Sequence, residues 1–214
     1  MISIKVDTSE FDKTFREYMR YTSRTMSEAC NQHAYYIARN ACNTTKSADK
    51  EKITQDLRAA SSKYPKAPLA AILVNKERKE KGKKGLNREN MRDAVEKFIR
   101  KRQSYRNFLR AGWLSAVKAI EPTVPKRNGT PIPKGMRAKG FKKGGARAAL
   151  DSITNWNPIA SIWNSVKGNK DGKNNEKIKS IIEEGAVAAI QQETISMREY
   201  IQRKMDEADW KLWK

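Results

Sequence analysis

The 214-residue sequence is poor in the residue types on which most catalytic and metal sites depend. It has one histidine, His33, and two cysteines, Cys30 and Cys42. It contains no glycine-rich nucleotide loop, no HExxH zinc motif and no calcium-binding loop. Without a second histidine, no motif points to a Ser-His-Asp or Cys-His arrangement, and His33 is better interpreted as a structural residue. We therefore expect no catalytic residues, no metal, no cofactor and a protein that is not an enzyme.

The sequence also lacks a long apolar run and a secretion signal. No stretch of about 18 apolar residues is present, so we expect no membrane span. The first residues, MISIKVDTSE, do not show the basic-then-apolar pattern of a signal peptide. Cys30 and Cys42 lie on one predicted helix, roughly 18 Å apart along its axis, which is beyond disulfide reach. We expect small, buried thiols in a protein made in a cytosol.

Acidic residues are scarce in one part of the chain. The whole sequence has 45 Lys and Arg against 24 Asp and Glu, a net charge of +21. Residues 76–147 hold 23 basic and six acidic residues and so supply +17 of this excess, whereas residues 148–214 balance at ten and ten. A localised excess indicates contact with a polyanion or with acidic partner subunits. The alternative, a solubilising surface, usually scatters its charge along the chain.

The most basic stretch is residues 124–147, VPKRNGTPIPKGMRAKGFKKGGAR, which has eight basic residues and no acidic one. Its five glycines and three prolines predict a long internal loop, which we call the basic arm and place at residues 121–148. It could be a tether, an arm that grips nucleic acid, or a loop that becomes ordered on assembly. The candidate polyanion- or subunit-binding residues on it are Lys126, Arg127, Lys134, Arg137, Lys139, Lys142, Lys143 and Arg147.

Hydrophobic periodicity predicts the elements of the first half. Alternating Ile2, Ile4 and Val6 predict a short strand, and apolar residues at helical spacing then predict one helix over about 9–42. Asp49 caps a second, shorter helix. The apolar run 69–75, LAAILVN, is either a buried strand or a helix fragment. Its length and the closing Ile-Leu-Val favour the strand.

In the second half, Asn87 is placed to cap a third long helix over about 88–120. Gly112 interrupts its apolar stripe and would allow a close contact with another element. Residues 149–168 have an ambiguous period and favour an edge strand or hairpin, and a last helix follows at about 176–210. The opposite face of the third helix adds four candidate binding residues, Arg100, Arg102, Arg106 and Arg110.

Together these elements predict a single α+β domain over residues 1–214. Three long helices pack with a small sheet of two or three short strands, and the basic arm forms a long internal loop. Aromatic residues are thinly interleaved with the basic ones, which argues against stacking on single-stranded bases. A nucleic-acid contact would then fall on the duplex backbone, without sequence reading.

Two segments resemble proteins of tailed double-stranded-DNA bacteriophages. The segment ISIKVDTSEFDKTFREYMRYTSRTMSEACNQHAYYIARNA (2–41) is similar to the start of tail-completion, or neck, proteins. The segment RQSYRNFLRAGWLSAVKAI (102–120) resembles a helix of phage minor virion proteins. In that family a long loop, where proteins of this kind contact neighbouring subunits, commonly follows the equivalent helix.

This resemblance implies a virion structural protein, made in the host cytoplasm, that forms an oligomeric ring at the head–tail junction. Its partners would be further copies of itself and portal, adaptor or tail subunits. The basic arm would face DNA in the channel or acidic faces of neighbouring subunits. The alternative is a sequence-independent, duplex-DNA-binding protein of architectural or packaging type, and an adaptor for an acidic protein is a third possibility.

Overall fold

A computed structural model describes residues 7–22, 24–61, 64–124, 131–133, 136, 145–149, 159–166 and 175–212. This part of the chain is mostly helical with two short antiparallel sheets, so the α+β class is confirmed. We expected one domain, but the chain divides into two compact units. Unit 1 comprises Met1–Lys46 and Phe108–Lys214, and unit 2 comprises Ser47–Asn107. The predicted N-terminal strand and most of the basic arm lie outside the described residues.

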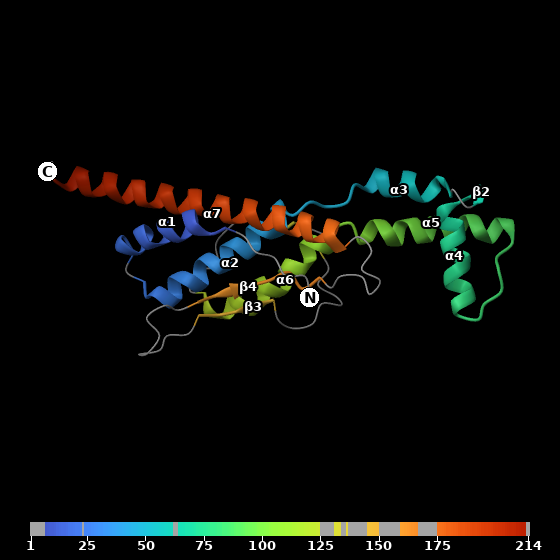
Figure 1. Cartoon of the computed structure of the whole chain (residues 1–214), viewed down its shortest axis with the longest axis horizontal. Coiled ribbons are helices and arrows are strands. Elements are labelled where there is room, and N and C mark those ends of the chain that lie inside the picture. Colours follow the sequence, from blue (N-terminus) through green and yellow to red (C-terminus); the bar gives the residue numbers. More distant parts are fainter. Residues whose placement is uncertain are drawn as a thin grey trace. The chain divides into compact units, whose positions relative to one another are not determined.

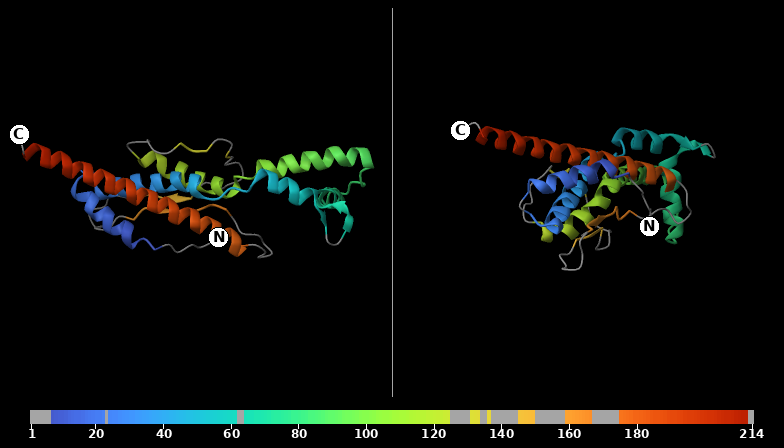
Figure 2. Two further views of the ribbon diagram at one scale, coloured as in Figure 1. Left: turned by 90° about the horizontal axis from the view of Figure 1, so that it is seen from above. Right: turned by 60° about the vertical axis from the view of Figure 1, so that its left-hand side comes forward.

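Unit 1 is a helical body. Its helices are α1 (Ser9–Arg20), α2 (Met26–Thr44), α6 (Phe108–Ile120) and α7 (Asn175–Leu212), with the 3₁₀ helix η1 (Glu121–Thr123). The last helix, drawn in red in Figures 1 and 2, runs beside both α1 and α2, and α6 packs on α2. Strand β3 (Ala146–Arg147) pairs antiparallel with β4 (Ser161–Ile162). The predicted C-terminal helix is therefore confirmed, and the ambiguous segment 149–168 contains the short strand β4.

The predicted helix 9–42 is in fact two helices, because α1 ends at Arg20 and α2 begins at Met26, so that prediction was wrong. Thr25 has extended backbone angles, and its side chain accepts a hydrogen bond from the backbone N–H of Glu28. The Glu28 carboxylate accepts one from the N–H of Thr25 in return, which completes a capping box. Such a cap contributes about 1 kcal/mol and fixes a helix start even where the apolar spacing continues.

The predicted helix 88–120 also divides, into α5 (Arg88–Ser104) and α6. The Asn87 cap is confirmed, because its side chain accepts from the N–H of Asn90 at 3.0 Å. No glycine or proline explains the break at 105–107. The backbone N–H groups of Tyr105 and Arg106 bond three residues back, as in a tightened last turn. The two halves belong to different cores, since α5 packs in unit 2 and α6 in unit 1.

Unit 2 is a smaller helical unit. Its elements are α3 (Lys50–Arg58), β1 (Ala60–Ser61), β2 (Tyr64–Pro68), α4 (Leu69–Glu80) and α5. The Asp49 cap of α3 is confirmed by a 2.7 Å bond from the N–H of Glu51. The small core consists of Leu57, Ala70, Val74, Phe98 and Ile99.

The predicted strand 69–75 is a helix instead, the first two turns of α4. The helix begins directly after Pro68 and continues through Asn75 into the run KERKE, up to Glu80. Leucine, alanine, lysine, arginine and glutamate are all strong helix formers, so the helix gains stability from residues beyond the apolar run. The strand of this region is β2, which contains both Pro65 and Pro68. Within the described residues it pairs with the two-residue strand β1, and a strand at the edge of a sheet tolerates proline.

Three helices of unit 1 meet at Thr45, the residue that follows α2. The Trp113 indole donates to the Thr45 hydroxyl at 2.9 Å, and the Arg110 guanidinium donates to the Thr45 carbonyl oxygen at 2.6 Å. The Thr44 hydroxyl donates to the carbonyl oxygen of Gly185 on α7 at 2.6 Å. A Cβ atom at Gly185 would lie 2.3 Å from the Thr45 hydroxyl oxygen, so α7 approaches this closely only through glycine.

The close contact expected at Gly112 is present in unit 1. The carbonyl oxygen of Gly112 accepts from the N–H of Ser165 at 3.1 Å, so the chain after β4 lies directly on α6. A Cβ atom at Gly112 would lie 2.0 Å from Asn164 Oδ1 and 2.8 Å from a Val166 methyl carbon. Asn164 is itself held by a 2.8 Å bond from its side-chain amide to the carbonyl oxygen of Leu109.

We predict that Gly112→Ala destabilises unit 1. The added methyl group must push away Asn164, and overpacking of this kind costs about 1–3 kcal/mol. The measurement is the free energy of unfolding in urea, followed by circular dichroism. Gly85→Ala in unit 2 is the matched control, because a Cβ atom there meets nothing within 4 Å. Equal stability of the Gly112→Ala variant and the wild type would contradict this packing.

Candidate functional site

The structure describes one of the eight predicted binding residues of the basic arm. Lys126, Arg127, Lys134, Arg137, Lys139, Lys142 and Lys143 lie outside the described residues. Arg147 is described: it is exposed on β3 in unit 1. The arm therefore remains a candidate binding element on its sequence alone.

Three of the four predicted helix arginines lie in unit 2 and are exposed. Arg100 and Arg102 are on α5, and Arg106 follows that helix. The Arg102 guanidinium lies over the Phe98 ring, 4.9 Å from its centroid, and 3.9 Å from a carboxylate oxygen of Glu77. Arg102 thus covers the unit 2 core, whereas Arg100 and Arg106 form no ion pair within the described ranges.

The fourth arginine, Arg110, is placed differently. It lies on α6 in unit 1, is half-buried, and donates to the carbonyl oxygen of Thr45 at the end of α2. The predicted row Arg100, Arg102, Arg106 and Arg110 is therefore divided, because the helix that was expected to carry it is broken at 105–107. The structure gives Arg110 a contact that holds α6 to α2.

Unit 2 contains a basic cleft that the sequence did not reveal as one site. The cleft has a volume of about 310 Å³ and lies between α4, the turn 81–87 and α5. Its lining residues are Val74, Glu77, Arg78, Lys81, Lys83, Leu86, Ala94, Lys97, Phe98 and Lys101. Five of these ten residues are cationic and one is acidic. The basic composition of 76–88 was visible in the sequence, but its meeting with Lys97 and Lys101 depends on the fold.

The charges of this cleft are poorly compensated. Lys81, Lys83, Lys97 and Lys101 are all exposed, and none of them has an ion pair in the part of the chain that the structure describes. Arg78 donates from Nε to the carbonyl oxygen of Lys84 at 3.0 Å, and among the described residues it has no carboxylate partner. We call these four lysines and their surroundings the lysine cleft.

His33 forms a buried pair in unit 1. Its side chain is 6% exposed, and Nδ1 lies 2.6 Å from an oxygen of Glu193, whose side chain is 5% exposed. The rings of Phe15 and Tyr18 meet it edge to face. The pair lines a recess of about 410 Å³ between α1, α2 and α7. The structural role expected for His33 fits this position between α2 and α7, although its partner is 160 residues away and could not be found from local spacing.

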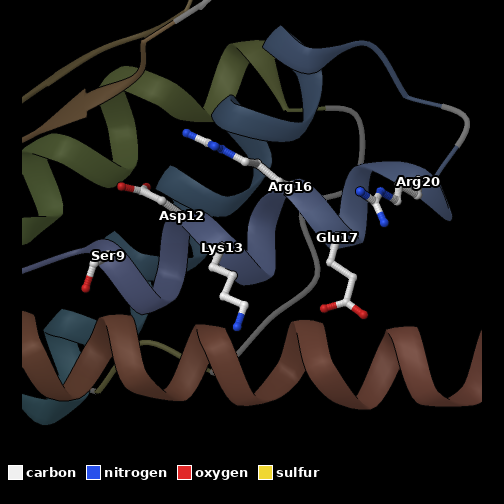
Figure 3. Close-up of a pocket in the computed structure, with 6 residues that line it drawn as sticks. All are labelled: Ser9, Asp12, Lys13, Arg16, Glu17 and Arg20. Carbon is white, nitrogen blue, oxygen red and sulfur yellow. The ribbon is translucent and has the colours of Figure 1, made fainter.

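Other polar features of the described residues do not converge on a site. Figure 3 shows a face of α1 with Lys13, Arg16 and Arg20 beside Asp12 and Glu17, all from one helix and of mixed sign. No group of three or more His, Cys, Asp or Glu that could hold a metal ion is present among the described residues. No helix in this part of the chain is long and apolar enough to cross a membrane.

Both cysteines lie on α2, and neither is in a disulfide bond. Cys42 is fully buried, and this burial raises the pKa of its thiol to about 12. Cys30 is half-buried, and burial raises its thiol pKa as well. Both thiols are therefore protonated near neutral pH and poor nucleophiles, since the thiolate is the reactive form. Cys42 is the buried apolar group that the sequence indicated.

Comparison with known proteins finds no matching family model, no matching curated protein and no matching solved structure.

We predict that Arg110→Ala lowers the free energy of unfolding by about 1.5–3 kcal/mol, the range for a lost hydrogen bond from a charged group. Arg100→Ala is the matched control: it removes the same charge from an exposed position, where substitutions change stability by less than about 0.5 kcal/mol. Urea unfolding of both variants measures the difference. If the two variants were equally stable, Arg110 would not hold α6 to α2.

Proposed function

We propose that this protein is a non-enzymatic structural component of a tailed-phage virion, of the neck or tail-completion type. In this proposal it forms an oligomeric ring at the head–tail junction, with unit 1 contacting neighbouring subunits. Unit 2 and the basic arm face DNA or acidic surfaces of portal, adaptor or tail subunits. The protein is made in the host cytoplasm and is incorporated into the particle.

The observation that carries this proposal is the separation of charge between parts of the chain. Unit 2 has 18 basic and eight acidic residues among the 61 residues of Ser47–Asn107. Residues 108–147 add ten basic residues against one acid, whereas 148–214, which include all of α7, carry no net charge. A nearly neutral helical segment suits contacts between subunits, and a cationic unit suits a polyanion.

The end of α7 supports assembly. The apolar stripe that packs inward on α7 includes Ile182, Ala189, Met197 and Ile201, all buried. Met205 follows Ile201 by four residues and so continues the same face, yet it is 42% exposed. Its neighbours from 202 to 208 are also exposed, except Lys204, which is half-buried. We assign this end of α7 to contact with a second copy of the chain.

We predict that Met205→Lys weakens self-association of the purified protein. A charge on the apolar stripe must be desolvated in the contact, which disfavours assembly. Sedimentation velocity over a range of protein concentrations measures the change. Gln202→Lys is the matched control, since it adds the same charge at an exposed position off the stripe. A protein that stays monomeric at all concentrations, or two variants that associate equally, would contradict an assembly role for this end of α7.

The proposed place in the virion has a direct test. Mass spectrometry of purified particles of the encoding phage should detect this protein in a fixed ratio to the portal protein. Negative-stain images of the purified protein should show rings. Its absence from intact particles would end the proposal.

The second candidate function is a sequence-independent duplex-DNA-binding protein of architectural or packaging type. The observation that favours it is the lysine cleft, whose four lysines have no ion pair among the described residues. The two functions differ in where the protein is found: the second predicts DNA binding by a protein that is absent from finished particles.

A further inference from the structure

We infer that the lysine cleft of unit 2 binds the phosphate backbone of duplex DNA, with Lys81, Lys83, Lys97 and Lys101 in contact with phosphates. The inference deepens the proposed function and rests on it in one respect, namely that DNA is the polyanion present. It adds a specific site, and it makes this contact independent of the basic arm.

The first argument is electrostatic. Four ammonium groups and the Arg78 guanidinium surround one cleft that contains a single carboxylate, Glu77. The Glu77 carboxylate also lies 3.9 Å from the guanidinium of Arg102, which is outside the cleft, so its negative charge is divided between Arg102 and the cleft cations. Like charges held around one opening repel one another, and an anion bound among them relieves that repulsion. The cleft is therefore arranged for a ligand with several negative charges.

The second argument concerns which part of a nucleic acid is bound. Phe98 is the aromatic residue of the cleft, but it is 5% exposed and Arg102 lies over its ring. It therefore offers no free face on which a base could stack, and stacking is the usual basis of single-strand binding. Lysine ammonium groups are compact point charges that suit phosphates without reading sequence. These features favour the backbone of a duplex.

The third argument distinguishes DNA from an acidic protein. Protein interfaces depend on large apolar or aromatic anchors at their centre, with charges at the rim. Among the described residues of unit 2, Tyr64 and Tyr105 are the exposed large hydrophobic residues, and neither lines the cleft. Along α5 outside the cleft, Arg88, Arg92 and Arg100 alternate with the acidic residues Glu89, Asp93 and Glu96, so the excess of positive charge lies at the cleft. A cationic surface without an accessible anchor fits an extended phosphate backbone better than a folded acidic partner.

The test replaces Lys81, Lys83, Lys97 and Lys101 together with glutamine in the full chain. Binding to a 30-base-pair duplex of arbitrary sequence is measured by fluorescence anisotropy at several salt concentrations. Each phosphate contact contributes about 0.9 to the slope of log K against log salt, so loss of the four lysines should flatten the slope by roughly 2–4. Binding at low salt should weaken by more than tenfold.

The matched control replaces four exposed lysines of unit 2 that lie outside the cleft, Lys50, Lys52, Lys66 and Lys76, with glutamine. Both variants have the same net charge and belong to the same unit. The control should lose less than half as much of the slope. Circular dichroism and thermal unfolding check that each variant folds, and the double variant Lys97→Gln, Lys101→Gln replaces the quadruple one if that fails to fold.

Three outcomes would overturn the inference. If the salt slope of the cleft variant equals that of the wild type, the cleft does not bind DNA. If the cleft and control variants lose the same amount of slope, the loss reflects net charge and not the cleft. Loss of binding to polyglutamate, with duplex binding intact, would assign the cleft to an acidic protein.

If the cleft variant binds DNA normally and the protein is still found in virions, only this inference fails. If the cleft binds DNA but the protein is absent from virions, only the proposed function fails.

Discussion

The packing of unit 1 depends on the junction at Thr45, where the end of α2 meets both α6 and α7. Thr45 is fully buried and directly follows the last turn of α2, where carbonyl groups lack helical partners. One side-chain donor each from Trp113 and Arg110 reaches it. Because Gly185 has no Cβ atom, the backbone of α7 can pack directly against Thr45. The hydroxyl and the carbonyl oxygen of Thr45 both accept hydrogen bonds at this buried helix end, and three helices separated widely in sequence are held together.

This junction also bears on the division of the chain. Unit 2 is inserted between Lys46 and Phe108 of unit 1. Lys46 directly follows Thr45, and Phe108 lies two residues before Arg110. The contact between Thr45 and Arg110 therefore joins the two ends of the insertion within unit 1. Because unit 1 closes on itself here, unit 2 can form its own core from α3, α4 and α5. The break at 105–107 lies at the border between the two units, with α5 in the core of unit 2 and α6 in the core of unit 1.

The sequence predicted the caps and apolar stripes better than the helix breaks. Asp49 and Asn87 were found because a cap is a local signal, and Gly112 because it interrupts a stripe. The break between Arg20 and Met26 was missed although the capping box of Thr25 and Glu28 is a local signal, because apolar residues at helical spacing lie on both sides of it. The break at 105–107 was missed because no glycine, proline or cap marks it, and the two halves differ in the core that each contacts. The same limit applied to the site. The charge of 76–88 was evident, but the cleft requires α4 to be helical and to pack beside α5, and Glu193 reaches His33 across 160 residues.

Unit 2 combines a small core with a large net charge. Five buried apolar residues stabilise it, while 18 basic and eight acidic residues in 61 positions repel one another on balance. Self-repulsion of this kind lowers the stability of a compact unit, and it is greatest where charges lack partners, as in the lysine cleft. A ligand that binds only the folded unit stabilises it by mass action. If a polyanion binds the folded unit, as we propose, the charge that weakens the isolated unit becomes favourable, and the stability of unit 2 then depends on that ligand.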